Sequence, residues 1–102
     1  MRFKEVLHKT SSEKIEAFCV KYHIRSLAFF GSILTSKFKK NSDLDILISF
    51  DPEYVPNLLS FVRIEAELTD LMGNRVDLRT ANDLSPYFRE EVIRQAEIFY
   101  GK

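Results

Sequence analysis

Apolar residues occur along the first third of the chain in two short blocks. The first block has helical spacing and comprises Ile15, Phe18, Cys19 and Tyr22. It follows the polar stretch 10–13, Thr-Ser-Ser-Glu, whose hydroxyl side chains are suited to capping a helix. The second block runs from Ser26 to Phe30 and stops at Gly31, which is typical of a short buried strand.

The rest of the chain continues this alternation. Leu44 to Phe50 is rich in Ile and favours a strand that ends at Asp51-Pro52. Asn57 to Leu71 suits an amphipathic helix, and Gly73 offers a left-handed cap behind it. Arg75 to Arg79 favours a third short strand. Tyr87 to Tyr100 is predicted to form a last helix, with inward positions Phe88, Val92, Ile93, Ala96 and Phe99.

The predicted order is therefore helix, strand, loop or short helix over 32–42, strand, helix, strand, helix. Such alternation predicts an α/β fold, a small mixed β-sheet of three or more strands with helices packed on it. A length of 102 residues fits a single domain over 1–102.

Composition and charge narrow the classes of function. Fifteen Lys and Arg balance fifteen Asp and Glu, so the basic excess of a general nucleic-acid binder is missing and direct nucleic-acid binding is not expected. There is no run of about 18 apolar residues, and Met1–Glu5 lacks an apolar signal region. The single cysteine, Cys19, has no disulfide partner and is predicted to be a buried core thiol. We expect a cytoplasmic protein.

Gly31-Ser32 is the first candidate for chemistry. A glycine after a strand lets the backbone approach a ligand, and amides at the start of a following helix attract phosphate. The Ser32 hydroxyl adds a donor. Taken alone, the same dipeptide is more often an ordinary turn.

Asp43 and Asp45 form the second candidate. Side chains alternate along a strand, so these two carboxylates should project to one face while Leu44 and Ile46 enter the core. Neighbouring carboxylates repel one another, and Mg²⁺, which prefers oxygen ligands, would relieve that repulsion. The alternative is a pair of solvated residues at a strand end.

Asp77 is the third candidate. Val76 and Leu78 should enter the core, so Asp77 points to the opposite face of a short strand, where aspartate is disfavoured. If that strand pairs with 44–50, Asp77 joins Asp43 and Asp45. Asp77 would then serve as a metal ligand or proton acceptor. The alternative is an ion pair with Arg75 or Arg79.

Gly-Ser after a strand, then Asp-x-Asp on a strand, then a further strand Asp, resembles the nucleotidyltransferase superfamily defined by DNA polymerase β. The similarity is greatest to its small MNT-type group, the minimal nucleotidyltransferases. It covers about residues 10 to 100 and includes the segments 29–32, 42–50, 58–71, 73–78 and 83–88.

This resemblance implies a polymerase β-like core and transfer of a nucleoside monophosphate, AMP from ATP, to a hydroxyl. Asp43, Asp45 and Asp77 would be the catalytic residues and would hold two Mg²⁺ ions. Gly31 and Ser32 would bind the β- and γ-phosphates. Within the MNT-type group, the usual partner is a helical HEPN toxin, with the nucleotidyltransferase as antitoxin, so the implied acceptor is a tyrosine of that toxin.

The chain departs from the family pattern after Gly-Ser, where many members carry arginines and this chain has Ile33-Leu34-Thr35-Ser36. Lys37, Lys39 and Lys40 follow, either as phosphate contacts or as a solvated basic turn. Two other functions stay open. One is an antitoxin that binds its toxin without catalysis. The other is a small-molecule nucleotidyltransferase, although 102 residues leave little material for an acceptor pocket.

Overall fold

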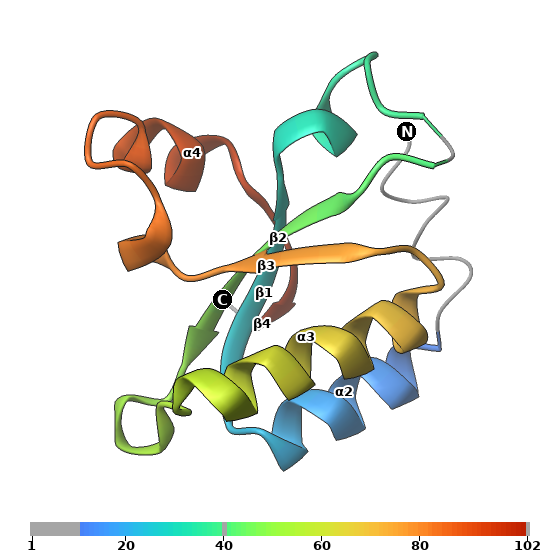
Figure 1. Cartoon of the computed structure of the whole chain (residues 1–102), viewed down its shortest axis with the longest axis vertical. Helices are drawn as coiled ribbons and strands as arrows, with labels where there is room; N and C mark the ends of the chain where they lie inside the picture. The colour runs from blue at the N-terminus through green and yellow to red at the C-terminus, as the bar shows by residue number, and fades with distance from the viewer. Residues whose placement is uncertain (1–10, 40, 102) are drawn as a thin grey trace.

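The computed structural model describes residues 11–39 and 41–101, which form a four-stranded mixed sheet with helices on both faces (Figure 1). The strand order is β3-β2-β1-β4, with β2 and β3 parallel and the other two pairs antiparallel. The elements are α2 (Ser12–Lys21), β1 (Ile24–Phe30), η1 (Gly31–Leu34), β2 (Leu44–Phe50), η2 (Pro52–Tyr54), α3 (Leu58–Met72), β3 (Val76–Arg79), η3 (Ala81–Asp83), α4 (Arg89–Gln95) and β4 (Glu97–Gly101). The α/β fold predicted from the sequence is confirmed.

Helices α2 and α3 lie side by side against one face of the sheet, while η1 and α4 lie on the other side (Figure 1). Glu67 of α3 ties the two helices together, because its Oε1 accepts a hydrogen bond from the Tyr22 hydroxyl at 2.7 Å and lies 3.3 Å from Lys21 Nζ. We call the sheet face opposite α2 and α3 the open face.

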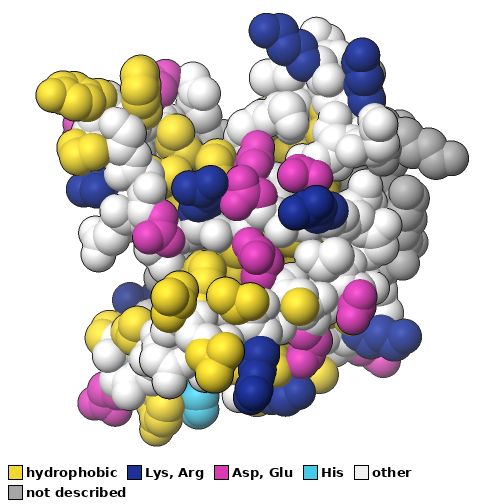
Figure 2. Space-filling view, viewed as in Figure 1, with side chains coloured by type: hydrophobic (Ala, Val, Ile, Leu, Met, Phe, Trp, Pro, Cys, Tyr) yellow, Lys and Arg dark blue, Asp and Glu magenta, His cyan; other side chains and the backbone are white. Residues whose placement is uncertain are grey.

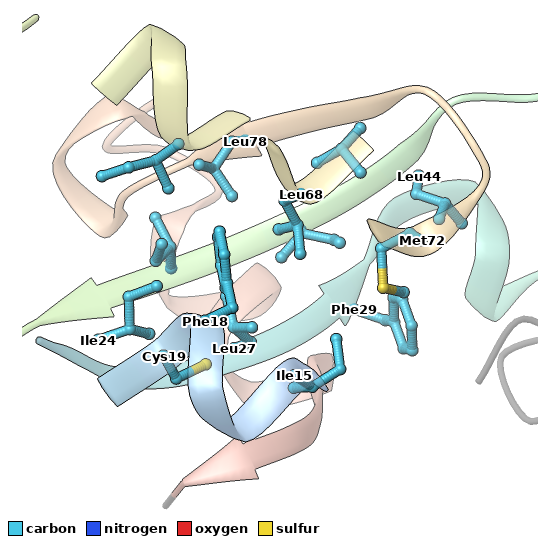
Figure 3. Packing of buried hydrophobic residues seen from close by; sticks show 14 of the residues in the cluster. Ile15, Phe18, Cys19, Ile24, Leu27, Phe29, Leu44, Leu68, Met72 and Leu78 are labelled. Carbon is cyan, nitrogen blue, oxygen red and sulfur yellow. The ribbon is translucent and has the colours of Figure 1, made fainter. Parts of the chain in front are cut away.

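The hydrophobic core fills the space between the sheet and these two helices (Figure 3). Strand residues alternate into it, which gives β2 the strict pattern of buried and half-buried positions expected of a sheet covered on one side. Burial raises the pKa of the Cys19 thiol to about 12, as expected of an inert core thiol, so the prediction for this residue is confirmed. The fully buried side chains include Cys19, Leu27, Phe29, Leu44, Ile46, Leu68 and Met72.

Most of the predicted elements are present with small shifts in their bounds. Gly73 ends α3 with a φ of 73°, the predicted left-handed cap. The first helix begins after Ser11, whose side chain makes no capping hydrogen bond, and Thr10 lies outside the described residues. Within α3 the buried positions are Ile64, Leu68 and Met72, whereas Leu58, Leu59 and Val62 of its first turns are exposed.

The prediction for the C-terminus was wrong. The segment expected to form one helix over 87–100 contains the short helix α4 and then the strand β4. Phe88 and Ile93, expected to face inward, are exposed. Phe99 instead stacks on Phe29 with ring centroids 4.2 Å apart, because β4 pairs with the edge of β1. An apolar run of this length can form a helix or a strand. Here its pairing with β1 favours the strand.

Among residues 11–39 and 41–101, no helix is long and apolar enough to cross a membrane.

Candidate active site

Asp45 and Asp77 are direct neighbours across the parallel strands β2 and β3. On the other side of β2, Asp45 is paired with Phe30, the last residue of β1 before Gly31. The prediction that residues 75–79 form a strand beside 44–50 is therefore confirmed, and it brings two of the three predicted carboxylates together on the open face.

Asp43 lies one residue before β2 begins and is exposed. Its charge still acts on Asp45, whose pKa it helps to raise. Asp43 therefore belongs to the same acidic cluster, which we define as Asp43, Asp45 and Asp77.

The position of Asp77 is fixed from the outer edge of the sheet by α3. The backbone N–H of Val76 donates to Thr69 Oγ1 at 3.1 Å, and that of Leu78 donates to Glu65 Oε2 at 2.9 Å. Because β3 is an edge strand, these two N–H groups have no neighbouring strand to bind, and the side chains of α3 accept their hydrogen bonds instead. An unpaired edge would be open to pairing with another chain. Thr69 and Glu65 were not predicted as site residues from the sequence, because nothing in the spacing of α3 marks them as partners of β3.

Gly31 brings the turn after β1 against the carboxylate of Asp45. Its φ is 74°, and a Cβ at this position would lie 2.3 Å from Asp45 Oδ2. The next residue, Ser32, donates its backbone N–H to the Asp45 carboxylate. Gly31 and Ser32 thus position Asp45, and the helix that begins at Gly31 is only the single 3₁₀ turn η1.

The negative charge of Asp45 is destabilised by its surroundings. Burial raises the pKa of its carboxyl group first, and repulsion from Asp77 and Asp43 raises it further. The hydrogen bond from Ser32 and the charge of Arg79 act in the opposite direction without cancelling the rise. The electrostatics of the site therefore favour the binding of a cation.

Asp77 is paired with Arg79, one of the alternatives that the sequence left open. The Nε of Arg79 lies 3.1 Å from Asp77 Oδ1, and its second terminal nitrogen lies 3.3 Å from Oδ2. Figure 2 shows acidic side chains gathered on the face above α3, with Lys or Arg side chains beside them. Asp77 therefore belongs to the acidic cluster, but its carboxylate is paired with Arg79.

The acidic cluster supplies the kind of oxygen ligands that Mg²⁺ prefers. Among residues 11–39 and 41–101, no three His, Cys, Asp or Glu side chains are already close enough to hold a metal ion. Two in-register carboxylates with mutual repulsion fit a site that also takes oxygens from its substrate, as Mg²⁺ sites for phosphates commonly do. The donor set therefore fits the metal.

The basic turn after η1 is exposed at Lys37 and Lys39, while Lys40 lies outside the described residues. Phe38, between the two lysines, is buried in the core and anchors this turn. The backbone N–H of Lys37 donates to Thr35 Oγ1 at 3.1 Å, and that of Lys39 donates to Ser42 Oγ at 2.9 Å. Backbone hydrogen bonds and the buried ring therefore hold the turn in shape.

Two hollows border β1, and no residue of the acidic cluster lines either of them. One, of about 460 Å³, lies on the open face beyond Asp45, and we call it the sheet pocket. Its floor includes Ala28, Leu47 and Ser49. The other, of about 1070 Å³, lies between the Gly31 turn and α4 and is lined by residues that include Thr35, Val92 and Gln95. We call it the turn hollow.

Known proteins are similar to this chain over most of its length. The family model "Polymerase beta, Nucleotidyltransferase" matches residues 13–102. A relative from Methanocaldococcus jannaschii, named "Putative protein adenylyltransferase", is 38% identical over 91 residues, which are 87% of this chain and 86% of the relative. "Protein adenylyltransferase MntA" of Thermococcus cleftensis is 36% identical over 75 residues, 74% of each chain.

Solved structures agree with this similarity. A "putative minimal nucleotidyltransferase" matches with a TM-score of 0.70 and 30% identity, and the match covers 94% of each chain. A chain of the MntA-HepT toxin-antitoxin complex matches with a TM-score of 0.60 over 88% of this chain and 69% of its own length. At 19% identity, the second match shows a shared fold.

Proposed function

The chain belongs to the polymerase beta nucleotidyltransferase family, and we propose that it transfers AMP from ATP to a hydroxyl group on a partner protein. The observation that carries this proposal is the in-register pair Asp45–Asp77 beside the turn at Gly31-Ser32. The names of the relatives support AMP as the transferred group and a protein as the acceptor.

The acidic cluster would hold Mg²⁺, with Asp45 and Asp77 on neighbouring strands and Asp43 at the start of β2. When bound, two such ions supply charge neutralisation at the attacking and leaving oxygens of an in-line displacement. The raised pKa of Asp45 supports this assignment, because burial and then repulsion from Asp77 and Asp43 disfavour its negative charge, and a bound cation would offset both.

The remaining roles belong to this chain's own groups. Asp77, half-buried on the edge strand, would accept the proton of the acceptor hydroxyl. The backbone N–H of Ser32 holds the Asp45 carboxylate in place, and the Ser32 hydroxyl is left to contact the triphosphate. Positioning and charge neutralisation supply most of the rate acceleration in phosphoryl transfer. A small, rigid sheet face is therefore sufficient to hold the reacting groups.

We propose a HEPN-type toxin as the partner and a tyrosine hydroxyl on it as the acceptor, so that this chain acts as the antitoxin of the pair. The shared fold with a chain of the MntA-HepT complex supports this proposal.

The proposed function is tested by incubating the chain with α-labelled ATP, Mg²⁺ and the protein encoded by the neighbouring gene. We expect label to move to the neighbouring protein, and to be lost when Asp43 or Asp77 is replaced by Asn. Mass spectrometry of the labelled protein should show an added AMP on a tyrosine.

Calorimetry with Mg²⁺ and a non-hydrolysable ATP analogue separates this function from neutralisation by contact alone. An antitoxin that acts only by contact would bind the neighbouring protein but would bind no nucleotide. That outcome, or labelling by both Asn variants at the wild-type level, would refute the proposed transfer.

Arg79→Gln is expected to tighten metal binding. Arg79 covers both oxygens of Asp77, so a divalent cation must compete with it, and its removal should lower the half-saturating Mn²⁺ or Mg²⁺ concentration about three- to tenfold. Stability should fall by no more than about 1 kcal/mol, because the pair is exposed.

The control for Arg79→Gln is Arg94→Gln, which breaks the exposed Arg94–Glu91 pair away from the acidic cluster. Metal titration by calorimetry should give the wild-type constant for that variant. Weaker metal binding by Arg79→Gln would show that Arg79 supports the metal site instead of competing for it.

A further inference from the structure

The two residues on either side of Asp77 are bound through their backbone to side chains of α3. The N–H of Val76 donates to Thr69 Oγ1, and the N–H of Leu78 donates to Glu65 Oε2. All four residues are at least half-buried. The outer edge of β3 is thus covered by two side chains of one helix.

The backbone of Asp77 itself faces the other edge, towards β2. Neighbouring residues of a strand direct their N–H and C=O groups to opposite edges, and the N–H groups of Val76 and Leu78 point outward. The carbonyl of Arg75, two residues before Asp77, accepts a hydrogen bond from the N–H of Leu44 at 2.8 Å, in agreement with this alternation. Asp77 is therefore held from both edges, directly by β2 and through its two neighbours by α3.

Helix α3 can bind this edge because its spacing matches that of the strand. Glu65 and Thr69 are one turn apart, so they lie on one side of the helix with about 6.0 Å of rise between them. Val76 and Leu78 are separated by a single residue, which corresponds to about 6.6 Å along a strand. Figure 1 shows α3 and β3 side by side and running in opposite directions, so the later helix residue meets the earlier strand residue. The two side chains occupy the places that acceptors of a neighbouring strand would take.

The place of the Asp77 carboxylate depends on the register of β3. A shift by one residue would turn Asp77 away from the open face, because side chains alternate between the two faces of a sheet. A smaller displacement would change the separation of Asp77 from Asp45, its neighbour in register on β2. The hydrogen bonds to Glu65 and Thr69 oppose both movements.

We propose that Glu65 and Thr69 are positioning residues for nucleotidyl transfer, which act on the metal site through the backbone of β3. This inference rests on the proposed function, in which Asp77 holds Mg²⁺. Partners that orient a metal ligand are typically worth roughly ten- to a hundredfold in metal affinity or activity. Because Glu65 and Thr69 bind the neighbours of the ligand and not its carboxylate, we expect the lower end of this range, about tenfold for each residue.

Glu67 provides a matched comparison on the same helix. It is half-buried like Glu65, but its Oε1 accepts a hydrogen bond from the Tyr22 hydroxyl at 2.7 Å and lies 3.3 Å from Lys21 Nζ. Glu67 therefore joins α3 to α2 and makes no contact with β3 that could move Asp77. Loss of either glutamate removes a hydrogen-bonding carboxylate from α3, and only loss of Glu65 should reach the metal site.

The test is a calorimetric titration with the Mn²⁺ complex of α,β-methylene-ATP. Glu65→Met and Thr69→Val keep the size of each side chain but remove the acceptor, and each should weaken binding about tenfold. Glu65→Gln and Thr69→Ser keep an oxygen acceptor and should restore binding to within about twofold of the wild type. Glu67→Met should also bind like the wild type, although it loses its bond to Tyr22.

Three outcomes of this titration would overturn the inference. The first is wild-type affinity in both Glu65→Met and Thr69→Val. The second is equal weakening by Glu67→Met, because the affinity would then follow the stability of α3 alone. The third is a loss in Glu65→Gln as large as that in Glu65→Met, because the amide oxygen of Gln can still accept the hydrogen bond from Leu78.

Hydrogen exchange of the unmutated chain gives an arm that does not depend on how the variants fold. If the two hydrogen bonds position Asp77, binding at the metal site must strengthen them in return, because such coupling is reciprocal. Saturating Mg²⁺ and α,β-methylene-ATP should therefore slow exchange of the Val76 and Leu78 amides at least about threefold relative to the Gly73 amide, which is bound to the carbonyl of Thr69. Equal slowing of all three amides, or of none, would contradict the proposed role.

The wild-type titration separates this inference from the proposed function. If the wild-type chain does not bind the metal–nucleotide complex, the proposed function fails, and Glu65 and Thr69 have no site to position. If the wild type binds the complex and the variants without an acceptor bind it equally well, the proposed function stands and only the inference fails.

Discussion

Replacing Asp45 with Asn is expected to abolish nucleotidyl transfer and, at the same time, to raise the melting temperature of the protein in EDTA. Metal stabilisation of a transferring phosphoryl group is worth several kcal/mol, and 1.36 kcal/mol is a factor of ten in rate, so the loss should be at least about a thousandfold. Asn keeps the size of Asp and an oxygen that can accept the hydrogen bond from Ser32.

The gain in stability follows from the sign of the pKa shift. Burial, and then repulsion from Asp77 and Asp43, raise the pKa of Asp45 in the folded chain above its unfolded value. The stability that protonated Asp45 contributes is complete below the unfolded pKa of about 4 and is lost as the pH rises through the folded pKa. Asn never ionises, so the variant keeps that stability at neutral pH.

Calorimetric melting in EDTA from pH 3 to pH 8 checks this expectation. The melting temperatures of the two proteins should coincide at the acid end and separate as the pH rises. Asp70→Asn, a change at an exposed position of α3, is the control and should follow the wild type throughout. A melting temperature for Asp45→Asn below that of the wild type at pH 7 would contradict the destabilising charge at Asp45. Retained transfer would contradict its catalytic role.

Gly31→Ala is expected to lower the transfer rate at least about a hundredfold. The added Cβ would lie 2.3 Å from Asp45 Oδ2 and 3.1 Å from Cγ, so the carboxylate must move. A misplacement of about 1 Å at a reacting centre costs roughly a factor of 10² in rate. Because Ser32 follows directly and holds the same carboxylate, the hydrogen bond to Asp45 should be disturbed as well.

Gly73→Ala is the matched control for this prediction. Gly73 has nearly the same backbone angle as Gly31, with φ values of 73° and 74°, but a Cβ added to Gly73 would meet no described atom within 4 Å. Both variants should lose about 1–2 kcal/mol of stability to the left-handed conformation, and only Gly31→Ala should lose activity. Comparison of melting curves and labelled-nucleotide transfer separates the two effects, and equal activities would rule out the steric role of Gly31.

Much of the fold was predictable because local patterns and tertiary structure agree. The β2 segment alternates strictly between core and open face, and Gly73 ends α3 where a left-handed residue is needed. Once β3 is placed beside β2, the alternation of side chains is sufficient to put Asp77 next to Asp45.

The remaining features depend on contacts that no local pattern encodes. The strand β4 exists because Phe99 stacks on Phe29 and because β1 would otherwise have a free edge. Arg79, in place of Arg75, pairs with Asp77, and this choice depends on side-chain direction. The sheet pocket requires α4 and the segment after β3 to meet over the sheet, and chain length alone does not indicate that 102 residues suffice for such a hollow.

The parallel pairing of β2 with β3 has a consequence for the order of events during folding. Asp45 and Asp77 are separated in sequence by the whole of α3, and parallel strands cannot pair until such a crossover has closed. Contacts of this range form late, after local helices and hairpins. We therefore expect nucleotide binding to appear only in the last kinetic phase of refolding, so that the ligand reports completion of the native state and not its intermediates.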